Sequence, residues 1–380
     1  MSFTPYSYYE FFAGGGMARS GLGENWRCLF ANDFDAKKAA SYAANWGDDH
    51  LAVGDVWEIG PERLPGRADL AWASSPCQDL SLAGRRAGLS GARSSAFWGF
   101  WRLMEALEHT GRGPRAIVIE NVAGLLTSRH GADFNALCDT LARQGYRFGA
   151  LEIDAALFVP QSRPRLFVVA SREPPSPALT LREPAAPFHS KRVVEAHARL
   201  SPAARAAWRW WRLAAPPARN LDLDALLEPD AKAAWHTSAE TERLLAQLGP
   251  VHRAKLAAAK AAGGRRVGAL FRRMRLEHGE RVQRAELRFD GLAGCLRTPG
   301  GGSSRQFLAV VEGERVRTRP LSPREGARLM GLADDYRLPA GATAGLHLVG
   351  DGVAVPVVRR LAEGLLEPLL AALPAIAAAE

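Results

Sequence analysis

Between Ser7 and about Ser171, short apolar runs alternate with stretches of helical character. This alternation limits the fold most, because it predicts βαβ units that build a mostly parallel sheet in an α/β domain. The runs at 148–153 and 166–170 leave no room for a helix between them, so we expect an antiparallel pair that ends the sheet. The other expected strands are 8–13, 27–32, 51–53, 68–73 and 116–119.

The residue composition changes after Arg172, where Glu173-Pro174-Pro175-Ser176-Pro177 is typical of a linker. Sequence rich in Ala, Arg and Trp follows without a strand pattern, although 254–262 favours a solvated helix. Ser322, Pro323 and Glu325 have the types and spacing of a helix start. A chain of 380 residues is long enough for two cores. We expect a catalytic domain over 1–172, completed by 322–380, and a second domain with a hinge over 173–321.

The net charge is +9, with 49 Lys and Arg against 40 Asp and Glu. Residues 191–288 alone hold 20 basic against 10 acidic residues, so we assign the excess to the second domain. This charge favours a polyanionic partner without identifying it.

The four cysteines lie far apart, and the nine histidines show no metal-ligand spacing. We therefore expect no metal site and no disulfide framework. Met1 to Glu10 lacks the basic start and apolar core of a signal peptide, and no uncharged apolar run reaches about 18 residues. A soluble cytoplasmic protein without membrane contact is expected.

A first polar constellation suits a nucleoside. Glu10-Phe11-Phe12-Ala13-Gly14-Gly15-Gly16 is a strand that runs into a glycine turn, where the backbone can approach a ligand or simply bend. Asp33 ends the next strand, where a carboxylate can bind both ribose hydroxyls, and Phe34 beside it can stack on adenine. Asp55, followed by Val56, ends the third strand, within reach of an adenine amino group. The absence of a phosphate-binding lysine favours S-adenosylmethionine over a nucleotide.

Cys77 follows a rigid proline, Pro76, where the apolar run 68–73 gives way to a polar loop. Most free cysteines are small buried hydrophobes, but the polar residues Gln78, Asp79 and Ser81 after it argue against burial. The loop from 82 to 95 is rich in glycine and arginine, including Arg85, Arg86 and Arg93. Such a loop can close over a polyanion and lower the thiol pKa, although it can also be an ordinary surface loop.

Two further motifs lie near this cysteine in the expected sheet. Glu120 ends the strand 116–119, and if that strand neighbours the one that leads to Cys77, a carboxyl and a thiol can face one planar substrate. An ion-paired or helix-capping acid is the alternative. Gln161-Ser162-Arg163-Pro164-Arg165 stands in the turn between the last two strands. The proline between the arginines lets one reach the active site while the other binds structure or phosphate.

These motifs together resemble those of bacterial-type DNA cytosine-5 methyltransferases. The sequence has Phe-Ala-Gly-x-Gly at 12–16, Pro-Cys-Gln at 76–78, Glu-Asn-Val at 120–122, Gln-x-Arg-x-Arg at 161–165 and Gly-x-x-Val at 350–353. The resemblance covers roughly 7–172 and 288–363. It implies the doubly wound, mostly parallel sheet of S-adenosylmethionine-dependent methyltransferases, with a smaller target-recognition domain inserted before the C-terminal motifs.

The resemblance also implies roles for individual residues. Cys77 would attack C6 of a flipped-out cytosine, Glu120 would bind its amine and N3, Arg165 its O2, and Arg163 would support the site. Residues that would bind the cofactor are Phe12, Gly14, Gly16, Asp33, Phe34, Asp55, Val56, Pro76, Asp351 and Val353. Two departures from the family pattern are Met17 in place of a glycine and Asp351 in place of an asparagine.

For the second domain, the expected DNA-binding residues are Arg265, Arg266, Arg272 and Arg273, which join Gln78, Ser81, Arg85, Arg86 and Arg93 of the first. An arginine can bind guanine in the major groove, but most contact phosphate or solvent. The cluster Trp208-Arg209-Trp210-Trp211 suits either stacking on bases or domain packing.

The function expected from this resemblance is sequence-specific DNA cytosine-5 methylation with S-adenosylmethionine as cofactor and duplex DNA as partner. The alternatives are a tRNA cytosine-5 methyltransferase and a catalytically silent DNA-binding regulator. A cognate restriction endonuclease is a candidate partner, as in a restriction-modification system. We expect a monomer that is cytoplasmic in a bacterium and associated with the nucleoid when bound to DNA.

Overall fold

The computed structural model describes residues 6–75, 96–277, 279–297 and 305–372. Pro76, Cys77, Gln78, Ser81, Arg85, Arg86 and Arg93 therefore lie outside the described residues. The chain divides into two compact units. Unit 1 comprises Met1–Asp154, Pro164–Pro216 and Val357–Glu380, and unit 2 comprises Ala155–Arg163 and Pro217–Pro356.

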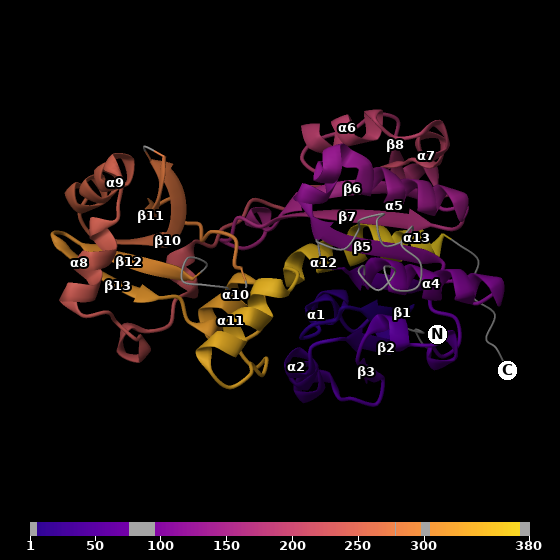
Figure 1. The fold of residues 1–380 in the computed structure, drawn as a ribbon, viewed down its shortest axis with the longest axis horizontal. Helices are drawn as coiled ribbons and strands as arrows, with labels where there is room; N and C mark the ends of the chain where they lie inside the picture. Colours follow the sequence, from indigo (N-terminus) through magenta and orange to yellow (C-terminus); the bar gives the residue numbers. More distant parts are fainter. Residues whose placement is uncertain (1–5, 76–95, 278, 298–304, 373–380) are drawn as a thin grey trace. The chain divides into compact units, whose positions relative to one another are not determined.

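Unit 1 is built on a seven-stranded sheet in the order β3-β2-β1-β4-β5-β7-β6 (Figure 1). Neighbours among β1 to β5 pair in parallel, whereas β7 is antiparallel to both β5 and β6. The seven expected strands are confirmed, with bounds that shift by a few residues. They are β1 (Tyr6–Phe11), β2 (Trp26–Asp33), β3 (Leu51–Val53), β4 (Leu70–Ser74), β5 (Ala116–Val122), β6 (Arg147–Asp154) and β7 (Pro164–Ser171).

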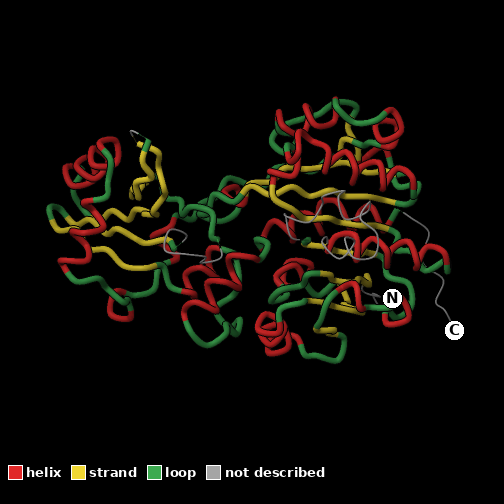
Figure 2. Tube along the Cα trace, viewed as in Figure 1, coloured by secondary structure: helices red, strands yellow, loops and turns green. Residues whose placement is uncertain are grey.

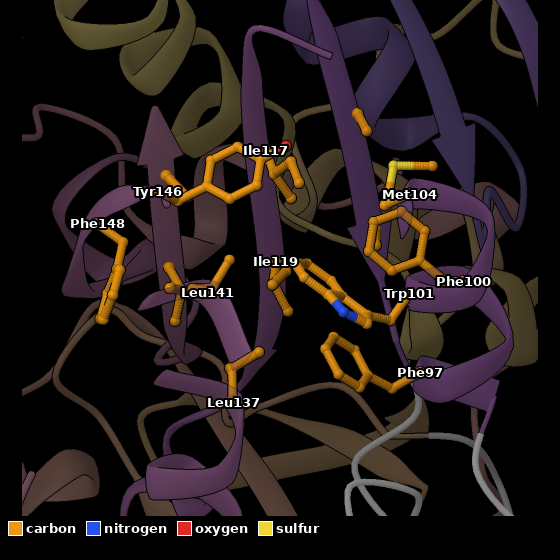
Figure 3. Packing of buried hydrophobic residues seen from close by; sticks show 14 of the residues in the cluster. Phe97, Phe100, Trp101, Met104, Ile117, Ile119, Leu137, Leu141, Tyr146 and Phe148 are labelled. Atoms are coloured by element: carbon orange, nitrogen blue, oxygen red, sulfur yellow. The ribbon is translucent and has the colours of Figure 1, made fainter. Parts of the chain in front are cut away.

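The main core lies between the sheet and the helices that connect its strands. Helix α4 (Ala96–His109) turns Phe97, Phe100, Trp101 and Met104 toward Ile117 and Ile119 of β5, and α5 (Ala132–Arg143) adds Leu137 and Leu141 (Figure 3). Buried positions three and four apart are what an amphipathic helix presents to a sheet. Two shorter connections are α1 (Met17–Leu22) and α2 (Ala36–Trp46).

Residues 173–216 belong to unit 1, where they pack on β6. They form β8 (Thr180–Leu181), α6 (Lys191–Ala198), α7 (Pro202–Ala207) and β9 (Trp210–Trp211). A Cβ added to Gly149 of β6 would stand 1.9 Å from the Arg209 carbonyl oxygen, so only glycine admits this segment. Trp208 and Trp211 are buried, and Trp211 Nε1 donates to the Val169 carbonyl at 3.1 Å. Packing, rather than stacking on bases, is the confirmed role of these two tryptophans.

The C-terminal helices return the chain to unit 1. They are α12 (Val355–Leu361), which begins at the unit boundary, and α13 (Glu367–Ala371), joined by a π-helical turn. Trp26 Nε1 donates to Glu367 at 2.9 Å, and the Arg115 guanidinium donates to the Leu370 carbonyl at 2.8 Å. No helix among the described residues is long and apolar enough to cross a membrane.

Unit 2 contains an antiparallel four-stranded sheet in the order β11-β10-β12-β13. Figure 2 shows the strands in yellow and the helices in red. Leu244 and Leu248 pack on Leu270 and Leu287 in its core. The elements are α8 (Ser238–Ala246), α9 (Pro250–Ala261), β10 (Arg265–Glu277), β11 (Glu280–Arg288), β12 (Gln306–Glu312), β13 (Arg315–Pro320), α10 (Pro323–Leu329) and α11 (Ala342–Asp351).

The second half of the chain can be compared with the expectations. Residues 173–216 group with unit 1 and 322–356 with unit 2, whereas the bounds of the functional domains stay predictions. The basic excess is shared, because 191–216 hold six basic against one acidic residue and 217–288 hold fourteen against nine. The absence of strands before Arg288 was a wrong prediction, since β10 and β11 lie there. The start of α10 at Ser322 and the exposed helix over 254–262 are confirmed.

A buried ion pair connects two elements of unit 2. Arg319 of β13 donates to both carboxylate oxygens of Glu325 in α10, at 2.7 and 2.5 Å, and both side chains are almost fully buried. Burial alone would raise the pKa of Glu325, but hydrogen bonds from Arg319 and the backbone N–H groups of Ser322 and Glu228 outweigh it and lower the pKa.

We predict that Arg319→Met destabilises the protein strongly, because it leaves the Glu325 carboxylate buried without its cation. Loss of one partner of a buried pair costs about 3–5 kcal/mol. Urea unfolding followed by circular dichroism measures the loss. The matched control is Asp334→Asn, which removes the exposed partner of Arg328 and is expected to change stability far less. Equal effects of the two substitutions would contradict the prediction.

Candidate active site

The parallel strands of unit 1 place their carboxyl ends along one edge of the sheet, and the candidate site is built there. β1 ends in a sharp turn with positive φ at Phe12 (58°), Gly14 (56°) and Gly16 (76°). A Cβ on Gly16 would stand 2.5 Å from Trp46 Nε1, so this position must lack a side chain. Phe12 is held in a conformation that costs a non-glycine residue energy and that occurs often at ligand sites.

Asp33 fastens the glycine turn to the end of β2. Its Oδ2 accepts the Gly14 N–H at 2.7 Å, and its Oδ1 accepts the Asp35 N–H at 2.8 Å. Burial raises the pKa of Asp33, and these two N–H groups oppose the rise. Each carboxylate oxygen retains a second lone pair, so the same group can accept hydrogen bonds from a ligand.

Phe34 and Asp55 lie at the next positions along this edge. Phe34 is 75% exposed, which is rare for a phenylalanine and leaves a ring face available for stacking. The Asp55 carboxylate accepts the Trp57 N–H at 3.0 Å, just after the end of β3. The Val56 side chain is buried in the main core. A contact between Val56 and a ligand would therefore come from its backbone, and its role stays a prediction.

Glu120 lies in β5 directly beside Ser74 of β4, since the two residues are partners in the parallel register. The strand that leads to Cys77 and the strand that carries Glu120 are therefore neighbours, as the sequence required. The Nε of Arg165, in β7, lies 3.2 Å from Glu120 Oε1, and both side chains are largely buried. Glu120 is thus an ion-paired acid, and its partner belongs to another of the predicted site motifs.

Asn121 links the ends of β4 and β5 in a way that sequence reasoning missed. Its side-chain amide donates to the Ser75 carbonyl at 3.1 Å and to the Ser75 hydroxyl at 3.2 Å. Its own oxygen accepts the Val122 N–H at 2.9 Å. The signal was present in the sequence, because Asn121 follows Glu120 in the motif at the strand end, but no role had been assigned to it.

Arg163 and Arg165 have different surroundings, although two positions separate them. The Arg163 side chain is buried in unit 2, where it donates to the carbonyl oxygens of Leu296 at 2.8 Å, Gly350 at 2.9 Å and Gly352 at 2.5 Å. It also donates to the Cys295 sulfur at 3.6 Å. Its place among the catalytic residues stays a prediction. The surroundings of the two arginines differ because the chain passes from unit 2 to unit 1 at Pro164.

The remaining predicted residues lie in unit 2. Asp351 is the last residue of α11 and is exposed, whereas Val353 is buried. Arg265 forms ion pairs with Asp224, Asp230 and Glu312. Arg266 is exposed, Arg272 lies over the Phe307 ring, and Arg273 pairs with Glu286. Their roles toward cofactor or DNA stay predictions.

A family model described as C-5 cytosine-specific DNA methylase matches residues 6–367. The chain belongs to this family. S-adenosylmethionine is the methyl donor that family and fold imply. The departure at Met17 fits the methylase fold, because the Met17 side chain is buried at the start of α1.

Curated relatives include type II methyltransferases. M.HpaII of Haemophilus parainfluenzae is 23% identical over 96% of this chain and 90% of its own length. M.BsuFI of Bacillus subtilis is 31% identical over 43% of this chain, and the match spans 38% of that relative's length. The alignments with the orphan methyltransferases of Bacillus phages rho11s and SPR likewise span only about a third of those relatives, at 29% and 34%.

Solved structures show the same fold at low sequence identity. The Dnmt2 methyltransferase of S. pombe has a TM-score of 0.62 at 15% identity and covers 96% of this chain and 99% of its own. The Entamoeba histolytica methyltransferase EhMeth has a TM-score of 0.61 with the same identity and coverage.

A further acid, Glu10, lies in β1 ahead of the glycine turn and is almost fully buried. Burial raises the pKa of Glu10 to about 8, and the charge of Arg19 opposes the rise. The backbone N–H of Arg19 opposes the rise as well. The pattern of the sequence did not distinguish this acid from an ordinary strand residue.

We predict that Glu10 makes the methylase less stable as the pH rises from about 4.5 to about 8. In that window the folded protein holds a proton that the unfolded chain has released, so stability falls by at most about 1.4 kcal/mol per pH unit. Glu10→Gln removes this contribution. Urea unfolding at pH 6 and pH 8 checks the difference, with the exposed Glu62→Gln as the control that keeps the wild-type slope. Identical slopes for all three proteins would refute it.

Proposed function

We propose that this protein transfers a methyl group from S-adenosylmethionine to C5 of a cytosine in a specific duplex DNA sequence. The family model across the chain supports the reaction class. The observation that carries the proposal is the position of Glu120, an acid paired with Arg165 and set beside the last residue of β4. Only three positions separate Ser74 from Cys77 in the sequence.

The described residues fit the methyl donor. The Asp33 carboxylate suits the two ribose hydroxyls, the exposed Phe34 ring suits the face of adenine, and Asp55 suits the adenine amino group. The glycine turn after β1 lets the cofactor approach the backbone. When bound, S-adenosylmethionine supplies an electrophilic methyl group on a sulfonium. Pro76, Asp351 and Val353 are proposed to complete the pocket.

Cys77 is the proposed nucleophile. Its thiolate adds to C6 of the cytosine, and the electron pair of the C5–C6 double bond moves to C5. C5 would then take the methyl group as the methyl–sulfur bond breaks, and would pass its proton to a base from water, after which the bond between C6 and the cysteine sulfur breaks and restores the aromatic ring. Transient addition is needed because C5 of an intact cytosine ring is too weak a nucleophile.

Glu120 and Arg165 hold the ring during addition. Glu120 accepts a hydrogen bond from the exocyclic amine and, in its protonated form, donates one to N3, where negative charge develops when the thiolate adds; Arg165 donates to O2. Their ion pair at 3.2 Å fixes the two side chains relative to each other before the substrate arrives. Asn121 is a positioning residue in this scheme, because its bonds to Ser75 fix the end of β4.

The target cytosine must leave the helix before Cys77 can reach C6. Flipping costs a few kcal/mol of lost stacking and pairing. We propose that Gln78, Ser81, Arg85, Arg86 and Arg93 offset this cost by contacts with DNA, and that Arg265, Arg266, Arg272 and Arg273 contact the duplex from unit 2. Binding of chromosomal DNA would bring the protein to the nucleoid.

A partner endonuclease is proposed on the strength of the relatives' names. M.HpaII and M.BsuFI are named as type II methyltransferases, whereas the two phage relatives are named as orphan enzymes. A restriction endonuclease that cleaves the same sequence is the partner expected in the first case. We propose a monomer as the active form, since one chain carries all the named residues.

The proposal is tested by methyl transfer from labelled S-adenosylmethionine to duplex DNA and to tRNA. We expect incorporation into DNA, and bisulfite sequencing of DNA from expressing cells then gives base and sequence context together. Incorporation into tRNA alone would identify the RNA enzyme instead. DNA binding without transfer to either substrate would indicate a silent regulator.

We predict that DNA containing 5-fluorocytosine at the target traps the protein covalently, because fluorine cannot leave as a proton does. Cys77→Ala should abolish the adduct, and denaturing gel electrophoresis detects it. Cys295→Ala removes another partly exposed thiol and should leave the adduct intact. An adduct that survives Cys77→Ala would show that the nucleophile lies elsewhere.

We also predict that Glu120→Gln lowers kcat by about 100-fold or more, the scale of acid–base and charge stabilisation at one group, with little change in KM for S-adenosylmethionine. Glutamine keeps the size of the side chain but loses the charge that pairs with Arg165. Single-turnover methyl transfer measures the chemical step. An unchanged kcat, or a loss confined to KM for the cofactor, would remove Glu120 from the reaction.

A further inference from the structure

The hairpin of β10 and β11 extends beyond the rest of the sheet in unit 2. β12 pairs with β10 only along Arg265–Phe271, whereas β11 pairs with β10 as far as Glu277. Within the described ranges, no third strand pairs with this outer part of the hairpin, which comprises residues 272–277 and 279–284 and is here termed the ribbon (Figure 1). Six residues of strand span about 20 Å.

The two faces of the ribbon differ in chemistry. One face carries Arg273 and Arg275, which pair with Glu286, and Glu277, which pairs with Arg284. Its charges are therefore largely matched within the protein. The other face continues the line of Leu270, which is buried in the core of unit 2, outward to residues 274 and 276.

This second face carries exposed apolar side chains. Met274 is 51% exposed and Leu276 is 74% exposed. They belong to a group of five exposed large hydrophobic side chains in the described part of the chain. Two of the other three, Phe34 and Val53, lie at the edge proposed to bind the cofactor. Single exposed apolar residues are ordinary, but two in line on one strand face of a narrow ribbon indicate a contact surface.

Polar residues that can read bases lie directly across the ribbon. Gln283 is the cross-strand partner of Met274, and Arg281 is the partner of Leu276. Arg281 is exposed, and no ion pair is found for it within the described ranges. Arginine and glutamine make the paired hydrogen bonds that distinguish guanine and adenine, and apolar side chains contact the thymine methyl group.

Charge and shape favour duplex DNA as the occupant. The ribbon holds five arginines against two glutamates. A two-stranded ribbon fits the major groove, which is about 12 Å wide, but not the minor groove, at about 6 Å. Pairing with a second copy of the chain is disfavoured, because arginines along both strands repel one another at an edge.

We propose that the ribbon enters the major groove of the target duplex, with Met274 and Leu276 against the 5-methyl group of a thymine and Arg281 and Gln283 on neighbouring base edges. The inference rests on the proposed function, since it names the feature of the substrate that the methylase selects. We assign the contacted methyl group to thymine because thymine carries a 5-methyl group in DNA that has not yet been methylated. The recognised sequence accordingly includes an A·T pair.

The test replaces each thymine of the target, as found by bisulfite sequencing, with uracil, which lacks only the methyl group. For the wild type, one such replacement should lower kcat/KM about fourfold, the factor that corresponds to one buried methyl group. The variant Met274→Ser/Leu276→Ser should treat thymine and uracil alike. Both side chains are exposed, so the fold should survive, and circular dichroism checks it.

The matched control is Val251→Ser, which removes an apolar side chain that is 67% exposed in α9 of the same unit. It should keep the wild-type preference for thymine. A target without thymine, a wild type indifferent to uracil at every position, or a double variant that keeps the preference would each overturn the inference while methyl transfer itself stands.

Binding separates this inference from the proposed function. Anisotropy of a fluorescein-labelled target duplex reports affinity with thymine and with uracil, whether or not methyl transfer occurs. A thymine preference that depends on Met274 and Leu276 in an inactive protein would support the ribbon and refute the methyltransferase. Absence of both binding and transfer would refute both, and size-exclusion chromatography showing dimers lost in the double variant would assign the face to a second copy.

Discussion

The parallel register between β4 and β5 is the constraint on which the candidate site depends. It sets Ser74 beside Glu120, and the side chain of Asn121 ties the two strand ends together beyond that point. Because the hydrogen bonds of the ladder fix this register, the acid and the segment that leads to Cys77 are brought together by backbone pairing. β7 then adds Arg165 from the antiparallel side. Three stretches far apart in sequence thus meet through sheet topology alone.

The same edge of the sheet carries the residues proposed to bind the methyl donor. β1 and β2 lie next to each other, so the Asp33 carboxylate can bind the Gly14 N–H and stabilise a turn whose backbone is unfavourable for Phe12. Ionised carboxylates accept strong hydrogen bonds from backbone N–H groups. The cost of the turn is therefore offset locally by a side chain of the neighbouring strand.

Sequence reasoning predicted the seven strands and the site motifs at their ends, because both are local patterns. Apolar runs indicate buried strands, and polar residues just after them indicate the exposed ends of those strands. It failed where the decisive information is not local. The hairpin of β10 and β11 has only a short buried section near Leu270, and its arginine-rich outer part has the composition of a loop. The separation of Arg163 from Arg165 depends on which unit each backbone segment joins, and no spacing rule contains that information.

The path of the chain through unit 2 bears on which changes of sequence this unit tolerates. Unit 2 consists of Pro217–Pro356 together with Ala155–Arg163, the short segment that joins β6 to β7. Gln161 binds the backbone of Leu296 and Leu329, and Arg163 binds that of Gly350 and Gly352. A recombination event that exchanged only the long segment would separate these side chains from the backbone they evolved with. Gln161 and Arg163 contact backbone carbonyl and N–H groups, which every sequence supplies. A different segment with the same backbone shape can therefore make the same contacts. Such an arrangement lets the side chains of Pro217–Pro356 vary while the contacts with Ala155–Arg163 stay constant.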